Sequence, residues 1–292
     1  MKNADNVVVT ERDVADHKSQ RKSGEYLKIK SPSQYQDEIL SFFSDEVKGG
    51  IALPFDKTLS DFRIRMGELT IVSGYSGHGK TAWLSFCMLY LLKQTKVLIA
   101  SFEMLPKATL GRSSDPTATY IESFVGQIEH RLYLYDAEGE TSAAKVLDVI
   151  YYAAEKLNVE IFVVDSLMKC GINEDDLNGQ KNFANKLAVA ARDLKIHIFL
   201  VAHSRKTVDE DTTPAKFDVA GSANITNMAD NSISVHRNKR KEKALMFGED
   251  PSEWASLPDC TVYLNKQRHG NGIETQWGFW FDSSTFRYME KP

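Results

Sequence analysis

This sequence has few cysteines, no long apolar stretch and no excess of positive charge. Its 292 residues include three cysteines, Cys87, Cys170 and Cys260, whose spacing offers neither four zinc ligands nor a disulfide framework. No stretch approaches the ~18 consecutive apolar residues of a membrane span, and the amino terminus has no apolar signal segment. We therefore expect buried thiols, no membrane association and a reducing, cytoplasmic compartment.

The charge balance excludes a protein that is coated in basic surface. The formal net charge is −4, so a site for nucleic acid has to be a local basic channel. Hydrophobic residues make up 42% of the chain and charged residues 26%, which provides enough apolar material for one large or two small cores. The composition thus indicates an ordinary globular protein.

The chain divides by composition into an arm, a helix and a domain. Residues 1–30 are polar, mixed in charge and aperiodic, which predicts a flexible arm. Residues 31–48 predict an amphipathic linker helix that Ser31 caps and that Gly49 and Gly50 end. Its apolar stripe packs either on its own domain or on a neighbouring subunit, and consists of Tyr35, Ile39, Phe42, Phe43 and Val47.

Apolar strand-like runs alternate with helical patterns from Glu68 onward. The expected strands are 68–74, 96–103, 159–166 and 196–204, and the expected helices are 80–93, 142–158 and 179–195. Continuous apolar strands are typical of a sheet with helices on both faces, so residues 50–292 predict an α/β domain with a mainly parallel central sheet. After residue 230 we expect no further helix, and a partly antiparallel extension of the sheet by strands at 231–237, 260–267, 275–282 and 285–289.

One glycine-rich segment carries the clearest chemistry. Residues 74–81, GYSGHGKT, match the P-loop pattern Gly-x-x-x-x-Gly-Lys-[Ser/Thr] between a predicted strand and a predicted helix. Lys80 is expected to reach the β- and γ-phosphate oxygens, and the Thr81 hydroxyl is expected to bind Mg²⁺. The loop predicts ATP and Mg²⁺ as ligands, against the alternative of a glycine-rich turn that binds nothing. The residues whose curled backbone is expected to face the phosphates are Gly74, Ser76, Gly77, His78 and Gly79.

Three further polar residues close apolar strands. Asp165 ends the run IFVVD, which delivers one carboxylate to the carboxyl end of a strand and predicts a part of the magnesium site. Glu103 ends VLIASFE and is expected to orient or deprotonate the water that attacks the γ-phosphate, with helix capping as the alternative. His203 follows IFLVA, where a structural role and a role as sensor of the γ-phosphate or of DNA are both open.

Several segments follow one another in the order of a known family. The sequence resembles the replicative ring helicases of the DnaB type, including the helicase part of phage primase-helicases, over about residues 50–290. The glycine-serine pair before MAD and VHRNK, followed by NKQRHG, is the most specific part of this resemblance. The matching segments are GELTIVSGYSGHGKTA, SFEM, IFVVDSL, FLVAHSRK, DVAGSANITNMADNSISVHRNK and LNKQRHG.

The resemblance implies a fold, an assembly and roles for residues. It implies a RecA-like P-loop NTPase fold, a ring of six subunits around single-stranded DNA, ATP between neighbouring subunits, and unwinding in the 5′-to-3′ direction. By the same resemblance, the P-loop and Asp165 hold phosphate and Mg²⁺, and Glu103 is the catalytic base. Lys266 and Arg268 match the pair that reaches the γ-phosphate of the neighbour; being two residues apart on a strand, they should share one face.

The segment from His203 to Ile225 matches loops that face the DNA channel in this family. Contacts with DNA phosphates are expected there from the side chains of Arg205, Lys206 and Lys216 and from the backbone of Gly221 and Ser222. Many relatives have an arginine before and a glycine after this Gly-Ser pair, where this chain has Ala220 and Ala223. A charge-based contact is therefore not expected at that point.

The charged run HRNKRKEK from residue 236 is interpreted as a solvated loop after a strand, in preference to a second DNA site.

These patterns together predict an ATP-dependent replicative DNA helicase of phage origin, acting in the cytoplasm of a bacterial host. A primase or a loader, where needed, is expected to come from other chains. Two alternatives stay open: a recombinase-like, DNA-stimulated ATPase that does not unwind DNA, and a loader or assembly factor that ATP controls. The hydrolytic set of Glu103, Lys266 and Arg268 argues against the second alternative, because a protein that only binds ATP needs no such set.

Overall fold

The computed structural model describes residue 33 and residues 50–101, 126–135, 141–173, 175–203, 223–270 and 272–291. The chain divides into two units, Met1–Gly49 and Gly50–Pro292. The predicted arm and linker helix at residues 1–48 lie outside the described residues, Ser33 excepted. The described fold is therefore that of the second unit.

A mixed sheet forms the centre of this unit. Within the described ranges it has nine strands in the order β11-β10-β9-β8-β3-β7-β6-β4-β5. Neighbours from β8 to β5 pair in parallel, and β9, β10 and β11 continue the sheet in antiparallel fashion. The strands are β3 (Leu69–Ser73), β4 (Val97–Ser101), β5 (Leu132–Leu134), β6 (Ile161–Asp165), β7 (His197–Val201), β8 (Asn231–Arg237), β9 (Cys260–Gln267), β10 (Thr275–Asp282) and β11 (Arg287–Met289), beside a separate antiparallel pair of β1 (Ile51–Ala52) and β2 (Arg63–Ile64).

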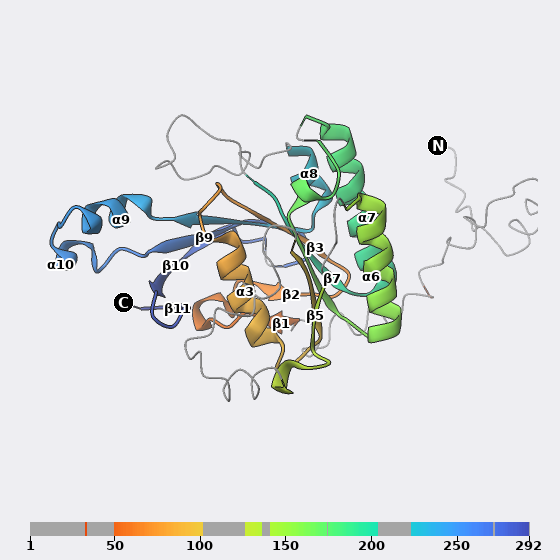
Figure 1. The fold of residues 1–292 in the computed structure, drawn as a ribbon, viewed down its shortest axis with the longest axis horizontal. Helices are drawn as coiled ribbons and strands as arrows, with labels where there is room; N and C mark the ends of the chain where they lie inside the picture. Colours follow the sequence, from red (N-terminus) through yellow and green to blue (C-terminus); the bar gives the residue numbers. More distant parts are fainter. Residues whose placement is uncertain are drawn as a thin grey trace, which may run out of the picture. The chain divides into compact units, whose positions relative to one another are not determined.

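Helices cover both faces of the sheet (Figure 1). On one face α3 (Lys80–Leu91) packs on the strands, and on the other face lie α6 (Ala143–Leu157), α7 (Leu177–Leu194) and α8 (Ala223–Met228). Successive residues of β6 enter the two opposite cores, so the whole strand is buried and reads as one continuous apolar run. None of the described helices is long and apolar enough to cross a bilayer.

The arrangement confirms the predicted α/β domain with a mainly parallel sheet and an antiparallel extension. One part of the prediction was wrong, because two helices follow β8 where none was expected. The segment interpreted as a solvated loop, residues 236–243, includes the first part of α9 (Lys239–Met246), and α10 (Pro251–Trp254) comes after it. In Figure 1 both helices lie at the far end of the long strands β8, β9 and β10, away from the other helices.

The charged helix α9 is held in place by a local cap and by contacts that are distant in sequence. Asn238 caps it by accepting a hydrogen bond from the Lys241 backbone N–H at 2.9 Å. The Lys241 ammonium is buried, 2.8 Å from a carboxylate oxygen of Asp259 and 2.7 Å from the carbonyl oxygen of Leu257. Leu257 and Asp259 lie just before β9, more than ten residues after the helix. The local charge pattern alone therefore did not predict α9.

A buried polar network lies at the amino-terminal edge of the parallel strands. His197, the first residue of β7, is fully buried, with Nδ1 2.7 Å from the carbonyl oxygen of Arg65 and Nε2 3.0 Å from the Thr70 hydroxyl. A carbonyl can only accept, so Nδ1–H donates to Arg65, and Nε2 of the neutral ring accepts from Thr70. Burial lowers the pKa of His197 to about 4.

The protein should lose stability as the pH falls below the pKa of a histidine in the unfolded chain, 6.5. Between these two pKa values the unfolded chain binds a proton at His197 that the folded chain excludes, so stability is present above 6.5 and declines toward 4. Going from about pH 7 to about pH 5 should cost about 2 kcal/mol of unfolding free energy from this residue alone. Urea unfolding of the wild type and of His197→Gln at both pH values measures the difference. An equal decline in both proteins would assign the pH dependence to other groups.

Candidate nucleotide-binding site

The P-loop begins where β3 ends, at the carboxyl edge of the parallel strands. Gly74 runs so close to β8 that a Cβ at this position would lie 2.4 Å from the carbonyl oxygen of Val235. Its φ of 149° is also one that L side chains rarely adopt. Both the space and the backbone conformation therefore require glycine as the first residue of the loop.

Lys80 holds the loop in its curled form. Its Nζ donates to the carbonyl oxygens of Gly74 at 2.9 Å and Tyr75 at 3.0 Å, and lies 3.3 Å from Nδ1 of His203. The lysine is 5% exposed and is the first residue of α3, where the amide groups of the helix end favour an anion. A phosphate group is a stronger acceptor than a carbonyl, so it can compete with the loop for this ammonium. The predicted residues Lys80 and His203 thus lie together at the loop.

The other predicted loop residues differ in where their side chains lie. Ser76 and Gly77 are exposed, and a Cβ at residue 77 would meet no atom within 4 Å, so this part of the loop is open to a ligand. His78 is buried instead, and its Nδ1 accepts a hydrogen bond from the Arg237 backbone N–H at 3.2 Å. The His78 side chain therefore anchors the loop on the end of β8, and its predicted contact with phosphate would have to come from its backbone.

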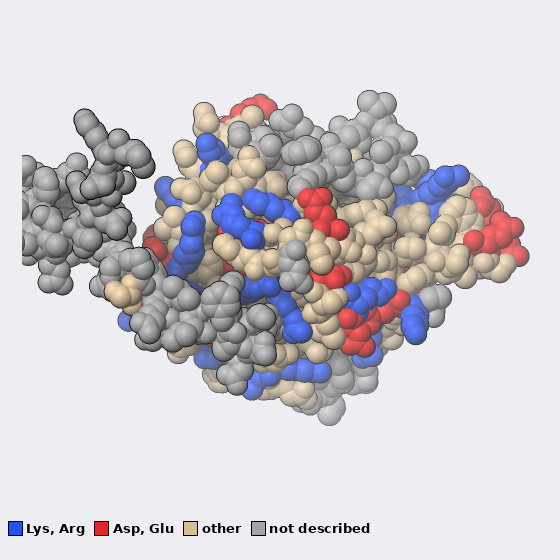
Figure 2. Space-filling model, turned by 180° about the vertical axis from the view of Figure 1, so that it is seen from behind, with Lys and Arg blue, Asp and Glu red and all other residues tan. Residues whose placement is uncertain are grey.

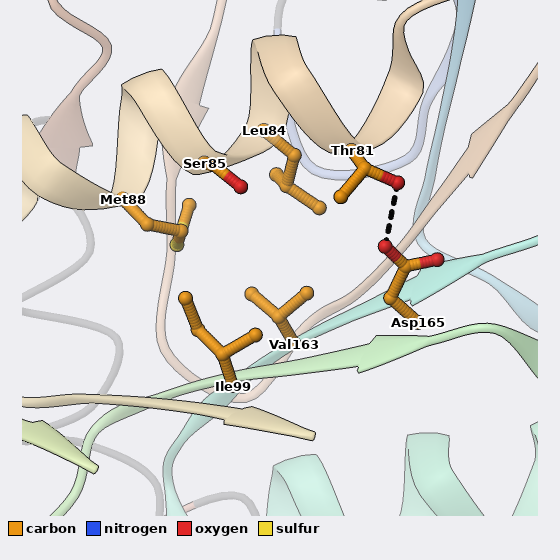
Figure 3. A pocket seen from close by; sticks show the side chains of 7 residues that line it. All are labelled: Thr81, Leu84, Ser85, Met88, Ile99, Val163 and Asp165. Atoms are coloured by element: carbon orange, nitrogen blue, oxygen red, sulfur yellow. Dashed lines mark hydrogen bonds between the residues drawn. The ribbon is translucent and has the colours of Figure 1, made fainter. Parts of the chain in front are cut away.

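Thr81 and Asp165 meet beside the loop. The Thr81 hydroxyl in the first turn of α3 donates to Oδ2 of Asp165 at 2.7 Å, and Asp165, the last residue of β6, is 2% exposed (Figure 3). Residues that are 84 positions apart in sequence are thus brought together, as the strand-end pattern predicted. A small cavity of about 10 Å³ lies next to the pair and is lined by Thr81, Leu84, Ser85, Met88, Ile99, Val163 and Asp165.

This pair of oxygen atoms suits Mg²⁺ bound together with a nucleotide. Magnesium takes one or two protein oxygens and completes its octahedron with waters and phosphate oxygens. Across the described ranges, no three His, Cys, Asp or Glu side chains gather into a metal cluster. The residues present therefore fit a metal that arrives with the phosphates better than one that the protein binds alone.

Several predicted residues lie outside the described ranges. Glu103 is one of them, although Ser101 at the end of β4 pairs with Asp165 in parallel register, so the chain leaves β4 at the edge where Asp165 lies. The DNA contacts predicted in 204–222 are likewise not described, namely Arg205, Lys206, Lys216, Gly221 and Ser222.

Lys266 and Arg268 lie at the opposite edge of the sheet from the P-loop. β9 runs antiparallel to β8, and Gln267 at its end pairs with Asn231 at the start of β8. The five residues of a parallel strand such as β3 span roughly 16 Å between the two edges. Both side chains contact the carboxyl end of α8, so they share one side of the sheet, although Arg268 comes one residue after β9. They are thus placed together, and apart from the P-loop of the same chain.

Two residues near these sites were not identified from the sequence. Tyr288 of β11 lies against the P-loop, since its hydroxyl would be 3.3 Å from a Cβ at Gly79 and its ring packs on Phe86 of α3. Asp230 forms an ion pair with Arg268 at 3.0 Å. A cluster of aromatic residues near the carboxyl end was the signal available for Tyr288; for Asp230, its place next to a predicted strand gave none.

Comparisons with known proteins agree with this architecture. A family model described as an AAA domain matches residues 54–209, more than half of the chain. A solved structure of a DnaB-like replicative helicase, studied with its interactions with primase, is 14% identical, with a TM-score of 0.68 over 90% of this chain and 67% of that chain. The solved ATPase domain of a second helicase is 16% identical, with a TM-score of 0.71 over 89% of this chain and 97% of that chain. At these identities the likeness establishes the RecA-like P-loop NTPase fold.

Proposed function

Because this chain belongs to the AAA domain family, we propose that it is an ATP-hydrolysing DNA helicase of the replicative type. It assembles into a ring of identical subunits, six by analogy with the DnaB type, moves along single-stranded DNA and unwinds duplex DNA in the 5′-to-3′ direction. The observation that carries this proposal is the position of Lys266 and Arg268 at the sheet edge opposite the P-loop. A primase or a loader would be a separate partner.

The two sheet edges support an ATP site shared between subunits. One edge offers Lys80, Thr81 and Asp165, which fit the triphosphate and its metal. The other edge offers two cations that do not reach the P-loop of the same chain. If subunits pack head to tail, Lys266 and Arg268 of one subunit face the P-loop of the next, so hydrolysis depends on the relative position of neighbours.

The residues of this chain then have distinct tasks in hydrolysis. The P-loop backbone and Lys80 would hold the β- and γ-phosphates, and Thr81 and Asp165 would hold Mg²⁺, which would supply positive charge beside the phosphates. Glu103 takes a proton from the attacking water, which it orients toward the γ-phosphate. Arg268 of the neighbour stabilises the charge on the transferred group.

DNA binding is proposed for residues 204–222, which join β7 to α8. This segment begins directly after His203, whose Nδ1 lies 3.3 Å from Nζ of Lys80, which would link the proposed DNA-binding segment to the P-loop. Seen from behind, Lys and Arg side chains gather over the central and left parts of the described surface, and toward the right they alternate with acidic side chains (Figure 2). A basic surface that is local in this way agrees with a net charge of −4. Contacts through Gly221 and Ser222 are proposed to use their backbone amides.

A forked DNA substrate tests the proposal directly. The wild type should displace the annealed strand of a fork with a 5′ single-stranded arm when ATP and Mg²⁺ are present, and should not act on a partial duplex with only a 3′ arm. Glu103→Gln should still bind ATP, but should lose hydrolysis by about 10²-fold or more, because the water lacks its base, and should not displace the strand. DNA-stimulated hydrolysis by the wild type without displacement would favour the recombinase-like alternative.

A further inference from the structure

The carboxyl end of α8 binds the Lys266 side chain. Lys266 Nζ donates to the carbonyl oxygens of Thr226 at 2.9 Å and Ala229 at 2.7 Å, and lies 3.5 Å from that of Asn227. These carbonyls stand at the negative end of the helix and have no partner further along it. The ammonium therefore joins the end of α8 to β9.

Arg268 is held at the same place by a buried carboxylate. Its Nη1 donates to Oδ1 of Asp230 at 3.0 Å, and its Nη2 donates to the carbonyl oxygen of Asn227 at 3.1 Å. The Asp230 side chain is 4% exposed, whereas that of Arg268 is 40% exposed. A guanidinium has five N–H donors in a rigid plane, so one edge can be held by the protein while another edge is presented outward.

Asp230 is itself fixed to the strand that carries the P-loop. Its Oδ2 accepts a hydrogen bond from the Leu69 backbone N–H at 3.0 Å, and its carbonyl oxygen accepts one from the Arg268 backbone N–H at 2.9 Å. β3 runs from Leu69 directly into the P-loop. One carboxylate therefore connects the start of β3 with the guanidinium of Arg268.

We propose that Asp230 is a positioning residue that orients Arg268 toward the nucleotide of the neighbouring subunit. Asp230 and the backbone carbonyl of Asn227 at the carboxyl end of α8 together hold the guanidinium, and we call this pair the holder of Arg268. The inference rests on the proposed function, because it takes Arg268 to act across a subunit interface. Asp230 lies at the sheet edge opposite the P-loop of its own chain and acts through Arg268. It restricts the guanidinium to one orientation before the neighbour's γ-phosphate is reached, which lowers the entropy cost of aligning the catalytic group.

Asp230→Asn should remove the hydrogen bond that holds Arg268 and keep the one that anchors residue 230 to β3. The amide oxygen can still accept from Leu69, but the NH₂ group that replaces the second oxygen cannot accept from Arg268. The DNA-stimulated kcat for ATP should fall about 10- to 100-fold because of misalignment, and the KM for ATP should change less than about twofold, because the P-loop is intact. Equal losses in kcat and in ATP affinity would point to general damage and overturn the proposal.

Glu68→Gln is the matched control. Glu68 is a buried carboxyl group at the same edge whose oxygen accepts a hydrogen bond from the Asn231 amide at 2.8 Å, and the side-chain oxygen of a glutamine can accept the same hydrogen bond. It forms no part of the holder of Arg268. This variant should keep the wild-type kcat. A loss as large as that of Asp230→Asn would mean that any change in the buried network is harmful, and would overturn the positioning role.

Two measurements distinguish this inference from the proposed function. Asp230→Asn added to Arg268→Ala should lower kcat no further, because a missing guanidinium cannot be misaligned; a further tenfold loss would show that Asp230 acts elsewhere. Mixed with Lys80→Ala, Asp230→Asn should regain activity as Arg268→Ala does, since the defect lies on the side that serves the neighbour. Recovery with Arg268→Ala but none with Asp230→Asn would overturn the inference alone. If Arg268→Ala itself fails to recover, the proposed shared site is wrong.

Discussion

Replacing Lys80 by alanine is expected to lower kcat for ATP hydrolysis by about 10³-fold. The ammonium is the positive charge that the P-loop itself provides for the β- and γ-phosphates. In the structure it is bonded to two loop carbonyls and lies beside His203. Its removal leaves those carbonyls short of a donor, which should cost about 2 kcal/mol of stability and leave the domain folded. Steady-state ATPase assays and thermal unfolding measure the two effects separately.

Lys96→Ala provides the matched control for this substitution. The Lys96 ammonium also donates to a backbone carbonyl, that of Leu157 at 2.9 Å, but it stands before β4, at the edge of the sheet away from the P-loop. This variant should hydrolyse ATP at the wild-type rate. Normal turnover by Lys80→Ala would remove the nucleotide site from the loop at residues 74–81.

Replacing Arg268 by alanine should lower kcat by about 10³-fold or more, the range for an arginine supplied by a neighbour, while ATP still binds. The P-loop of the variant is complete, so the loss should be in the chemical step. Nucleotide affinity, measured with a fluorescent ATP analogue, should stay close to that of the wild type. A loss of affinity equal to the loss of turnover would place Arg268 in substrate binding.

Mixing Arg268→Ala with Lys80→Ala should restore part of the activity. When rings form at random from equal amounts of the two variants, about one interface in four has an intact P-loop on one side and an intact Arg268 on the other. DNA-stimulated hydrolysis should therefore rise well above the sum of the two separate proteins once subunits have exchanged, which a fluorescence energy transfer pair can verify. If exchanged mixtures stay inactive, Arg268 does not act across the interface.

The double variant Lys80→Ala/Arg268→Ala is the control for mixing. Combined with either single variant, it creates no interface that has both an intact P-loop and an intact arginine. Activity should therefore not return in these mixtures. A rise there would reflect general stabilisation by added protein and not complementation.

The parallel part of the fold was predictable because both faces of its strands are buried. Runs such as 159–166 are apolar without alternation, and the observed β6 lies inside this range. The helix at 239–246 was missed because it is polar on nearly every side, and Lys241 is buried by partners that follow α10. The three-residue strand β5 was also not predicted, since so short a segment carries little pattern of its own.

Site residues were predictable where a short sequence motif or a strand end marks them. They were not predictable where the position of a side chain depends on segments that are distant in sequence. The loop at residues 74–81 and Asp165 follow from a motif and from a strand end, and the structure places Thr81 and Asp165 in contact. The burial of His78 was not predictable, because it depends on β8 passing beside the loop. The holder of Arg268 depends on a carboxylate next to a strand, which resembles any other polar residue until the sheet order is known.

Because β9 runs antiparallel to β8, Lys266 and Arg268 lie at the edge of the sheet opposite the P-loop of the same chain. In the proposed head-to-tail assembly, a single subunit therefore contains half of each of two ATP sites and no complete site. An open row of subunits would leave one P-loop at its end without an arginine from a neighbour, and closing the row into a ring would complete that last site. On this proposal, the ATPase activity per chain should fall on dilution, because subunits separate, even when each subunit keeps its fold.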